Sequence, residues 1–290
     1  RNIWPDKDVG SGASSKDRRV NPLYLYVEPD AAPATGEDAP TELKKEAWGG
    51  ITYFFPSSSQ EQSKTKFVDL WIRSEGKGTL HIDLGTISED QIPDKKLNTE
   101  DVAGNFANNI YDDGEDIGLD GKPDEEEFLI VKSWETGNYE TLYYGDEKLK
   151  KYKRNPNDPS LDNFNYKAGT QDFEYLRTVN GTENNAKDAG TNGRPDTENR
   201  NNNPAIDIQN NYRSVAIPLK YTIDDPENQY IESETEKSGT KTGWKLYRIP
   251  LIEFQNMNGF DDASFGWDNI ESMRLWLDGV DDNDERVFVA

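Results

Sequence analysis

The residues of this chain that could do chemistry are mostly carboxylates, and their densest run lies between Asp112 and Glu126. Calcium takes about six to eight hard oxygen ligands, which a flexible acidic loop with glycines can wrap around the ion. Gly118 and Gly121 permit the tight turns that such a loop needs. The run lacks the EF-hand spacing, so it predicts a calcium loop of another kind, with a solvated acidic turn as the alternative. The expected ligands are Asp112, Glu115, Asp116, Asp120 and Asp124.

A second candidate site lies in an asparagine-rich stretch near residue 200. Asn199, Asn201 and Asn203 alternate there, and Asp207 follows. Amide and carboxylate oxygens are both calcium ligands, so the pattern resembles a degenerate calcium loop. An asparagine-rich surface loop explains it equally well.

Most catalytic chemistries lack their residues in this chain. It has no cysteine and a single histidine, His81, which excludes thiol catalysis and leaves little room for a triad or a zinc site. No nucleophile elbow, phosphate-binding loop or dinucleotide fingerprint occurs. Carboxylate pairs are too frequent to single out a glycosidase pair. We therefore expect a protein that is not an enzyme.

The tryptophans offer a different kind of site, a platform on which a sugar could stack. Trp48 and Trp267 lie in loop contexts and are the candidate stacking residues. Trp71 and Trp276 lie in strand-like segments with apolar neighbours, which favours a place in the core.

The composition restricts the classes of molecule that this chain could bind. Lys and Arg number 33 against 56 Asp and Glu, a formal charge of −23. Such a chain repels the phosphates of nucleic acids and anionic membrane surfaces. It can instead attract divalent cations or basic partners. No apolar run approaches the roughly 18–20 residues that a membrane helix needs. The chain starts at Arg1 without an initiator Met or a signal peptide, which suggests a processed segment or a fragment of a larger protein.

The elements that must position these residues have strand character. Segments rich in β-branched and aromatic residues alternate with turns, and the turn 75–78 predicts a hairpin between 67–72 and 79–84. Pro218 and Pro250 predict the ends of two strands. Seven or eight strands suit an all-β, jelly-roll sandwich. The expected strands cover 22–27, 51–55, 67–72, 79–84, 212–217, 244–249, 272–277 and 286–289.

Two parts of the chain depart from this pattern. Residues 1–45 are rich in Gly, Ser, Ala, Pro and charge, which predicts a loosely structured tether before a sandwich domain at 46–290. A loop-rich insertion covers about 88–211, with short strands or turns at 128–131 and 173–179. So long a loop needs something to order it, and a structural metal is the natural candidate.

Seven phrases taken together resemble one family, the very large outer-membrane translocon proteins of the bacterial type 9 secretion system (the SprA/Sov family, associated with gliding motility). They occur in that family's order, from about residue 65 to the end. Residues 1–45 show no clear match. The phrases cover 78–90, 115–121, 155–166, 179–184, 194–198, 247–251 and 270–277.

The resemblance implies a non-catalytic, soluble β-rich domain attached to a giant outer-membrane barrel. It implies other translocon components or secreted cargo as partners, at the bacterial cell envelope, on a side of the outer membrane left open. Segments 244–254 and 267–277 also look like galactose-binding-like carbohydrate modules. The alternative is therefore a calcium-dependent carbohydrate-binding module of a secreted or cell-surface protein, with glycans as ligands.

Overall fold

The computed structural model divides the chain into two compact units. Unit 1 is built mainly from residues 41–87 and 210–290, and unit 2 mainly from residues 88–209. Among the described residues, no helix has the length and apolar character to cross a membrane. The structure describes residues 22–27, 48–55, 62–92, 94–101, 108–133, 136–152, 154–165, 181–185, 193–201, 203, 205–255, 265–268, 270–280 and 285–290.

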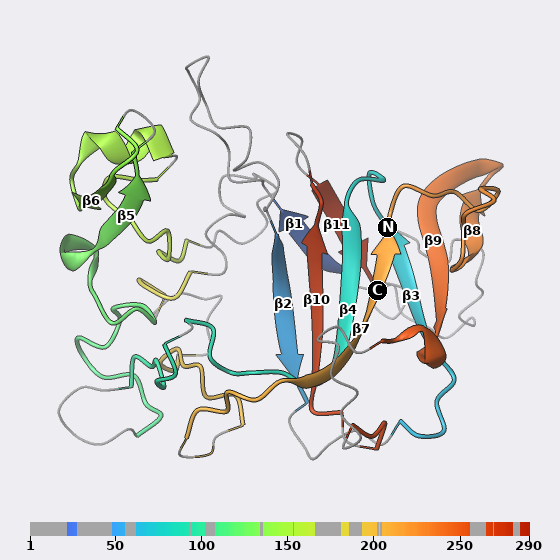
Figure 1. Ribbon diagram of the computed structural model, residues 1–290, viewed down its shortest axis with the longest axis horizontal. Coiled ribbons are helices and arrows are strands. Elements are labelled where there is room, and N and C mark those ends of the chain that lie inside the picture. Colours follow the sequence, from blue (N-terminus) through green and yellow to red (C-terminus); the bar gives the residue numbers. More distant parts are fainter. Residues whose placement is uncertain are drawn as a thin grey trace. The chain divides into compact units, whose positions relative to one another are not determined.

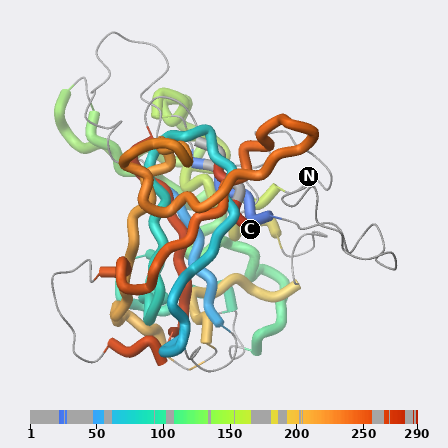
Figure 2. Tube along the Cα trace, turned by 90° about the vertical axis from the view of Figure 1, so that its right-hand side faces the viewer, coloured from blue at the N-terminus to red at the C-terminus, as the bar shows by residue number. Residues whose placement is uncertain are grey.

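Unit 1 contains two antiparallel sheets (Figure 1). The five-stranded sheet has the order β1 (Leu23–Val27), β11 (Glu285–Val289), β3 (Phe67–Arg73), β9 (Thr240–Pro250), β8 (Ile231–Lys237). The four-stranded sheet has the order β2 (Gly49–Phe54), β10 (Ser272–Asp278), β4 (Thr79–Thr86), β7 (Asn211–Pro218). Figure 2, turned by 90°, shows these strands lying roughly along a common axis, with neighbouring strands antiparallel. The 3₁₀ turn η4 (Leu251–Glu253) follows β9.

One hydrophobic core joins the two sheets, which makes unit 1 a β-sandwich. Strand β4 shows how the sequence sets its faces. Leu80, Ile82 and Leu84 alternate into the core, whereas His81 and Asp83 lie on the opposite face. The five-stranded sheet contributes buried side chains such as Ile72 and Ile249 from the other side. The strands predicted from apolar alternation are therefore present, and β7 and β9 end at their prolines as expected.

The hairpin expected at 75–78 is wrong. β3 pairs with β9 and β11, while β4 pairs with β7 and β10, so the turn carries the chain from one sheet to the other. Gly76 and Gly78 adopt positive φ there, and a Cβ on Gly78 would meet the Asp278 carbonyl oxygen at 2.6 Å. The local turn signal indicated a reversal of the chain but not which strands pair.

Two edge strands of the sandwich differ from the prediction. One, β1, lies before the expected sandwich domain at 46–290, and the other, β8, was not predicted. β1 lies within residues 1–45, yet it pairs with β11 and buries Leu25 and Val27. Apart from Pro22, the remainder of residues 1–45 lies outside the described residues. β8 was not predicted, because its sequence Ile-Glu-Ser-Glu-Thr-Glu-Lys is mostly polar, as suits an edge strand.

Unit 2 has little regular structure among its described residues. A hairpin of β5 (Phe128–Lys132) and β6 (Tyr139–Tyr143) is followed by the 3₁₀ turn η3 (Glu147–Tyr152), drawn in green in Figure 1. A second 3₁₀ turn, η2 (Asp124–Glu126), precedes β5. The buried apolar cluster here has only Val131, Leu142 and Leu149. The segment 173–179, expected as a strand or turn, lies outside the described residues.

Candidate metal centre

Buried carboxylates, rather than apolar side chains, organise the described part of unit 2. Removing a carboxylate from water is costly unless its oxygens are hydrogen-bonded or paired with a cation. Most of these carboxylates accept hydrogen bonds from backbone amides distant in the chain, which ties the loops together. The buried acidic residues are Glu89, Glu100, Glu115, Glu127, Asp158, Glu183 and Glu198.

Glu198 and Glu89 form a reciprocal pair of such ties. Glu198 is fully buried, and its carboxylate accepts the amides of Gln91 and Ile92 at 2.8 Å and of Asn98 at 3.0 Å. Glu89 accepts the amides of residues 200, 201 and 207 in return. The two ends of the long insertion are therefore held together by charge-assisted hydrogen bonds.

Glu100 makes a third tie, between the loop at residue 118 and the segment at residue 196. Its carboxylate accepts the Gly118 amide at 3.0 Å and the Asp196 amide at 2.7 Å. Burial raises the pKa of Glu100 to about 7, and burial likewise raises the pKa of Asp196. Asn185 donates its side-chain amide to Asp196, and its backbone amide to Asp116 at 3.2 Å.

The acidic cluster, as we name it, brings together five carboxylates from three distant segments. Its ligand-type oxygens form two groups, and within each group they all lie within 4.8 Å of one another. Glu127 belongs to both groups. The first group is Asp120, Glu127 and Asp162, and the second is Asp124, Glu127 and Glu183.

Backbone hydrogen bonds fix the geometry of the cluster. Glu127 follows η2, and its Oε2 accepts the Ser160 amide at 3.1 Å. Glu183 Oε1 accepts the Asp124 amide at 3.2 Å. The Glu183 amide in turn donates to the Asp162 carbonyl at 3.0 Å, which joins the second and third segments. Glu127 and Glu183 thus each satisfy a backbone amide that no strand or helix pairs.

The electrostatics of the cluster disfavour five free negative charges. Burial raises the pKa of Glu183 to about 8 and that of Asp162 to about 7, with the neighbouring Glu127 charge a further cause for Asp162. Burial also raises the pKa values of Asp124 and Glu127. A divalent cation bound among these oxygens would stabilise their ionised forms. The donor set is all oxygen, which fits hard cations.

The structure brings only part of the predicted loop into this cluster. Asp120 and Asp124 belong to it. The other three predicted ligands make hydrogen bonds elsewhere. Asp112 is exposed and accepts a hydrogen bond from the Asn108 side-chain amide. Glu115 accepts the Asp112 backbone amide at 2.7 Å, and Asp116 accepts the Asn185 backbone amide. Sequence reasoning missed Glu127, Asp162 and Glu183 as ligand candidates. Asp162 and Glu183 lie inside phrases that carry the family resemblance, which was the available signal.

The asparagine loop is held by hydrogen bonds within itself. Asn201 and Asn203 donate their side-chain amides to Asp207 Oδ2 at 2.6 and 2.9 Å, and their own side-chain oxygens accept backbone amides. Asn199 donates to the Asn203 carbonyl. No His, Cys, Asp or Glu metal cluster is found at this loop among the described residues. Calcium binding at this second loop stays a prediction.

The two candidate stacking tryptophans have different surroundings. Trp267 packs edge-on against Phe254 and Phe265 beside the core. Trp48 is 68% exposed and lies edge-on to Trp276, with ring centroids 6.3 Å apart. Contrary to the core position that its apolar neighbours favoured, Trp276 lies on the outer face of the four-stranded sheet and stacks on His81. Its Nε1 donates to the buried Asp83, which also accepts Arg274 Nε at 2.7 Å.

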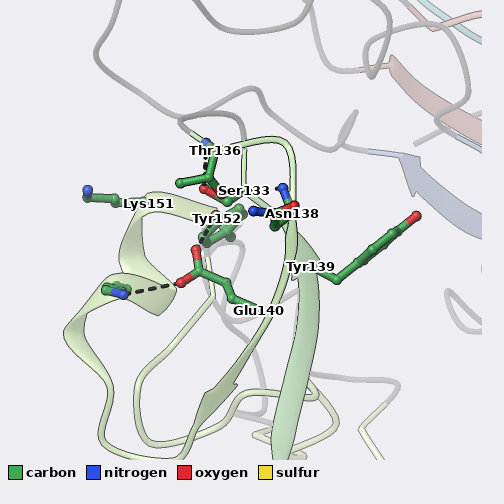
Figure 3. A pocket seen from close by; sticks show the side chains of 8 residues that line it. Ser133, Thr136, Asn138, Tyr139, Glu140, Lys151 and Tyr152 are labelled. Carbon is green, nitrogen blue, oxygen red and sulfur yellow. Dashed lines mark hydrogen bonds and ion pairs between the residues drawn. The ribbon is translucent and has the colours of Figure 1, made fainter.

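A small cavity lies beside the β5–β6 hairpin of unit 2. Its volume is about 200 Å³. Glu140 projects toward it and pairs with Lys148 at 3.2 Å, while the Tyr152 hydroxyl donates to the same carboxylate (Figure 3). These polar groups already satisfy one another. The lining residues are Ser133, Thr136, Asn138, Tyr139, Glu140, Lys148, Lys151 and Tyr152.

Comparison of the chain with protein-family models and with curated proteins gave no match in either case.

Proposed function

We propose that this chain is a non-catalytic domain of a bacterial outer-membrane protein-export translocon of the type 9 secretion system, acting as a scaffold or binding surface. It would work at the cell envelope, with other translocon components or secreted cargo as partners. The proposal rests on the resemblance of seven phrases and on where five of them meet.

The observation that carries the proposal is that these five phrases supply one connected network. The phrase at 78–90 contains Glu89, and the phrase at 194–198 contains Glu198. Each of these carboxylates accepts backbone amides from the segment that contains the other. The phrases at 115–121, 155–166 and 179–184 contain Asp120, Asp162 and Glu183 of the acidic cluster. Phrases that combine into one structural network are better evidence of a shared domain than the same phrases scattered over unrelated loops.

The way the carboxylates are used supports a structural role. Glu89, Glu100 and Glu198 accept two or three backbone amides each, so their lone pairs are committed to holding loops. A general acid or base needs an oxygen free to exchange a proton with a substrate. These three carboxylates therefore serve to hold loops together and are unsuited to exchange a proton with a substrate.

The jelly-roll topology belongs to the same proposal. Successive strands change sheet repeatedly, since β2, β4 and β10 lie in one sheet while β3, β9 and β11 lie in the other. Repeated crossing between sheets is how jelly rolls connect their strands. A galactose-binding-like jelly roll is compatible with this distribution of strands between the two sheets.

Sequencing the gene upstream of the codon for residue 1 and downstream of the codon for residue 290 tests the export role. We expect neighbouring segments of about ten residues that alternate apolar and polar side chains, as barrel strands do. The tagged full-length gene product should also copurify with secretion components from outer membranes. Flanking glycosidase or dockerin-like sequence would overturn the proposal.

One observation favours the second candidate, a carbohydrate-binding module. The exposed ring of Trp48 lies edge-on to Trp276, which stacks on His81 on the outer face of the four-stranded sheet, and a sugar could stack on the Trp48 ring. Calorimetry with polysaccharides would show saturable binding that Trp48→Ala abolishes and Tyr139→Ala, an equally exposed aromatic of unit 2, leaves intact. Absence of binding across a glycan array would exclude this candidate.

A further inference from the structure

The acidic cluster has a feature that a solvated acidic patch lacks, because buried oxygens in it are left without hydrogen bonds. Glu127 is 1% exposed and Glu183 is 4% exposed. Each uses one oxygen to hold a backbone amide, and the other, Glu127 Oε1 or Glu183 Oε2, has no partner among the described residues. Asp162 Oδ1 is likewise buried and unpartnered. A buried carboxylate oxygen that is left without a partner destabilises the folded state.

The unpartnered oxygens are distributed over both groups of the cluster. Asp162 belongs to the first group, Glu183 to the second, and Glu127 to both. Each group therefore has two residues with a buried oxygen that lacks a hydrogen-bond donor. In each group the third carboxylate, Asp120 or Asp124, is partly exposed and could complete a coordination shell together with water.

Charge balance points to more than one cation. The five carboxylates carry a formal charge of −5 when ionised. Among the described ion pairs, one ammonium group lies against them, Lys122 Nζ at 3.4 Å from Asp120 Oδ2, and it is partly exposed. One divalent ion plus Lys122 would leave −2, whereas two divalent ions plus Lys122 leave the cluster neutral.

We propose that Glu127 bridges two hard divalent cations, one held with Asp120 and Asp162 and the other with Asp124 and Glu183, and that calcium is the ion class. The paired ions fasten the loop at 120–127 to the segments at 158–162 and 181–185. This site is independent of the export role proposed above, since either could fail without the other.

The ligand chemistry selects calcium among the common cations. All five side chains are carboxylates, an all-oxygen donor set of the kind that calcium takes in large shells. Magnesium demands a small octahedral shell and keeps most of its waters. Zinc prefers nitrogen and sulfur ligands, and the chain has no cysteine and one histidine, located in unit 1.

Counting bound calcium ions tests the bridge. The whole 290-residue chain is stripped of metal with a chelating resin and titrated with calcium chloride by calorimetry and equilibrium dialysis. Glu127→Gln should remove two equivalents of bound calcium per chain relative to the unsubstituted protein, or weaken both at least about tenfold. Asp162→Asn and Glu183→Gln should each remove one. The matched control is Glu126→Gln, which deletes an exposed charge from the adjacent residue and should change neither number.

Three results would overturn the proposal. Loss of a single equivalent in Glu127→Gln would mean one ion and no bridge, and unchanged binding would mean no site. Should Glu127→Gln fail to fold, hydrogen exchange of the unsubstituted chain decides the question. Calcium should slow exchange of the Asp124 and Ser160 amides, which are bonded to Glu183 and Glu127. Exchange of both amides that is indifferent to calcium would be the third overturning result.

Discussion

Gly118 shows how closely a single residue is fitted to the acidic cluster. It is buried, adopts φ of +69°, and donates its amide to Glu100 at 3.0 Å. A Cβ at this position would collide with Asp162 Oδ2. Glycine is therefore required twice here, for its backbone conformation and for the space that Asp162 occupies.

Replacing this glycine should cost both stability and calcium binding. We expect Gly118→Ala to lower the free energy of unfolding of unit 2 by about 2–4 kcal/mol, from backbone strain and displacement of Asp162. Gly137→Ala is the matched control, because φ is +70° there and no atom lies within 4 Å of the added Cβ. It should cost only about 1 kcal/mol and leave calcium affinity unchanged. Equal effects of the two substitutions, measured by denaturation and titration, would refute the steric account.

Tyr247 illustrates the opposite situation, a polar group that the core of unit 1 accommodates without a partner. Its ring is buried on β9, and its hydroxyl has no hydrogen-bond partner among the described residues. Burial raises its pKa to about 12, from 10.0. The unpaired hydroxyl thus destabilises the folded sandwich.

The sign of the pKa shift gives a pH-dependent prediction. Between pH 10 and 12 the unfolded chain releases the Tyr247 proton while the folded chain retains it, so stability falls as pH rises from the unfolded pKa toward the folded one. Tyr247→Phe should be neutral to about 1 kcal/mol more stable at pH 8, and its advantage should grow by about 1.4 kcal/mol on going to pH 11. Urea denaturation at both pH values measures this. An advantage that stays constant with pH would contradict it.

At the scale of elements, the sandwich and the loops of unit 2 are stabilised by different interactions. The strands pair along ladders and bury alternate apolar residues. The described segments of unit 2 instead wrap around carboxylates, and the fully buried Glu198, with its three amides, is the clearest case. Carboxylates thus perform the task that strand pairing performs in unit 1.

Glu198→Gln tests this tie directly. The substitution removes the charge and turns one acceptor into a donor that faces amide hydrogens, which should cost about 2–4 kcal/mol locally. Hydrogen exchange at Gln91, Ile92 and Asn98 should accelerate at least about tenfold. Glu232→Gln on the exposed face of β8 is the control and should leave those amides unchanged. Undisturbed exchange in Glu198→Gln would show that the loops are held by other contacts.

At the scale of the whole molecule, the two units should respond differently to metal. Unit 1 has a large apolar core, whereas the buried apolar cluster described in unit 2 has three members. A ligand that binds only the folded state stabilises by about 2.7 kcal/mol at one hundred times its dissociation constant. Unit 2 has few other sources of stability. Bound metal should therefore determine whether its melting temperature equals that of unit 1 or lies below it.

Calorimetry with and without a chelator measures the difference. With calcium we expect the transition of unit 2 at a temperature at least about 5 °C higher than in EGTA, while the transition of unit 1 stays within about 1 °C. Magnesium at the same concentration should restore little of the shift. A melting profile that EGTA leaves unchanged after verified metal removal would contradict the cation account.

The sequence alone determined the features that depend on local patterns. Alternation of apolar residues predicted β3, β4, β7 and β10 close to their observed bounds and β9 without its first four residues, because side chains in a strand alternate regardless of the partner strand. The Asp112–Glu126 run contains two members of the acidic cluster, Asp120 and Asp124, but the other three predicted ligands lie outside that cluster. Polar edge strands such as β8 gave no apolar signal and were missed.

Only the tertiary structure decided which residues meet. Turn chemistry at 75–78 specified a reversal, but the pairing of β3 with β9 and of β4 with β10 is set by core packing across the sheets. Likewise, Glu127 lies near Asp162 and Glu183 because their backbones are held by hydrogen bonds between distant loops, which no spacing along the chain encodes. Of the predicted ligands, Asp120 and Asp124 therefore enter the acidic cluster by virtue of the fold, and Glu127, which the spacing did not single out, is shared by both of its groups.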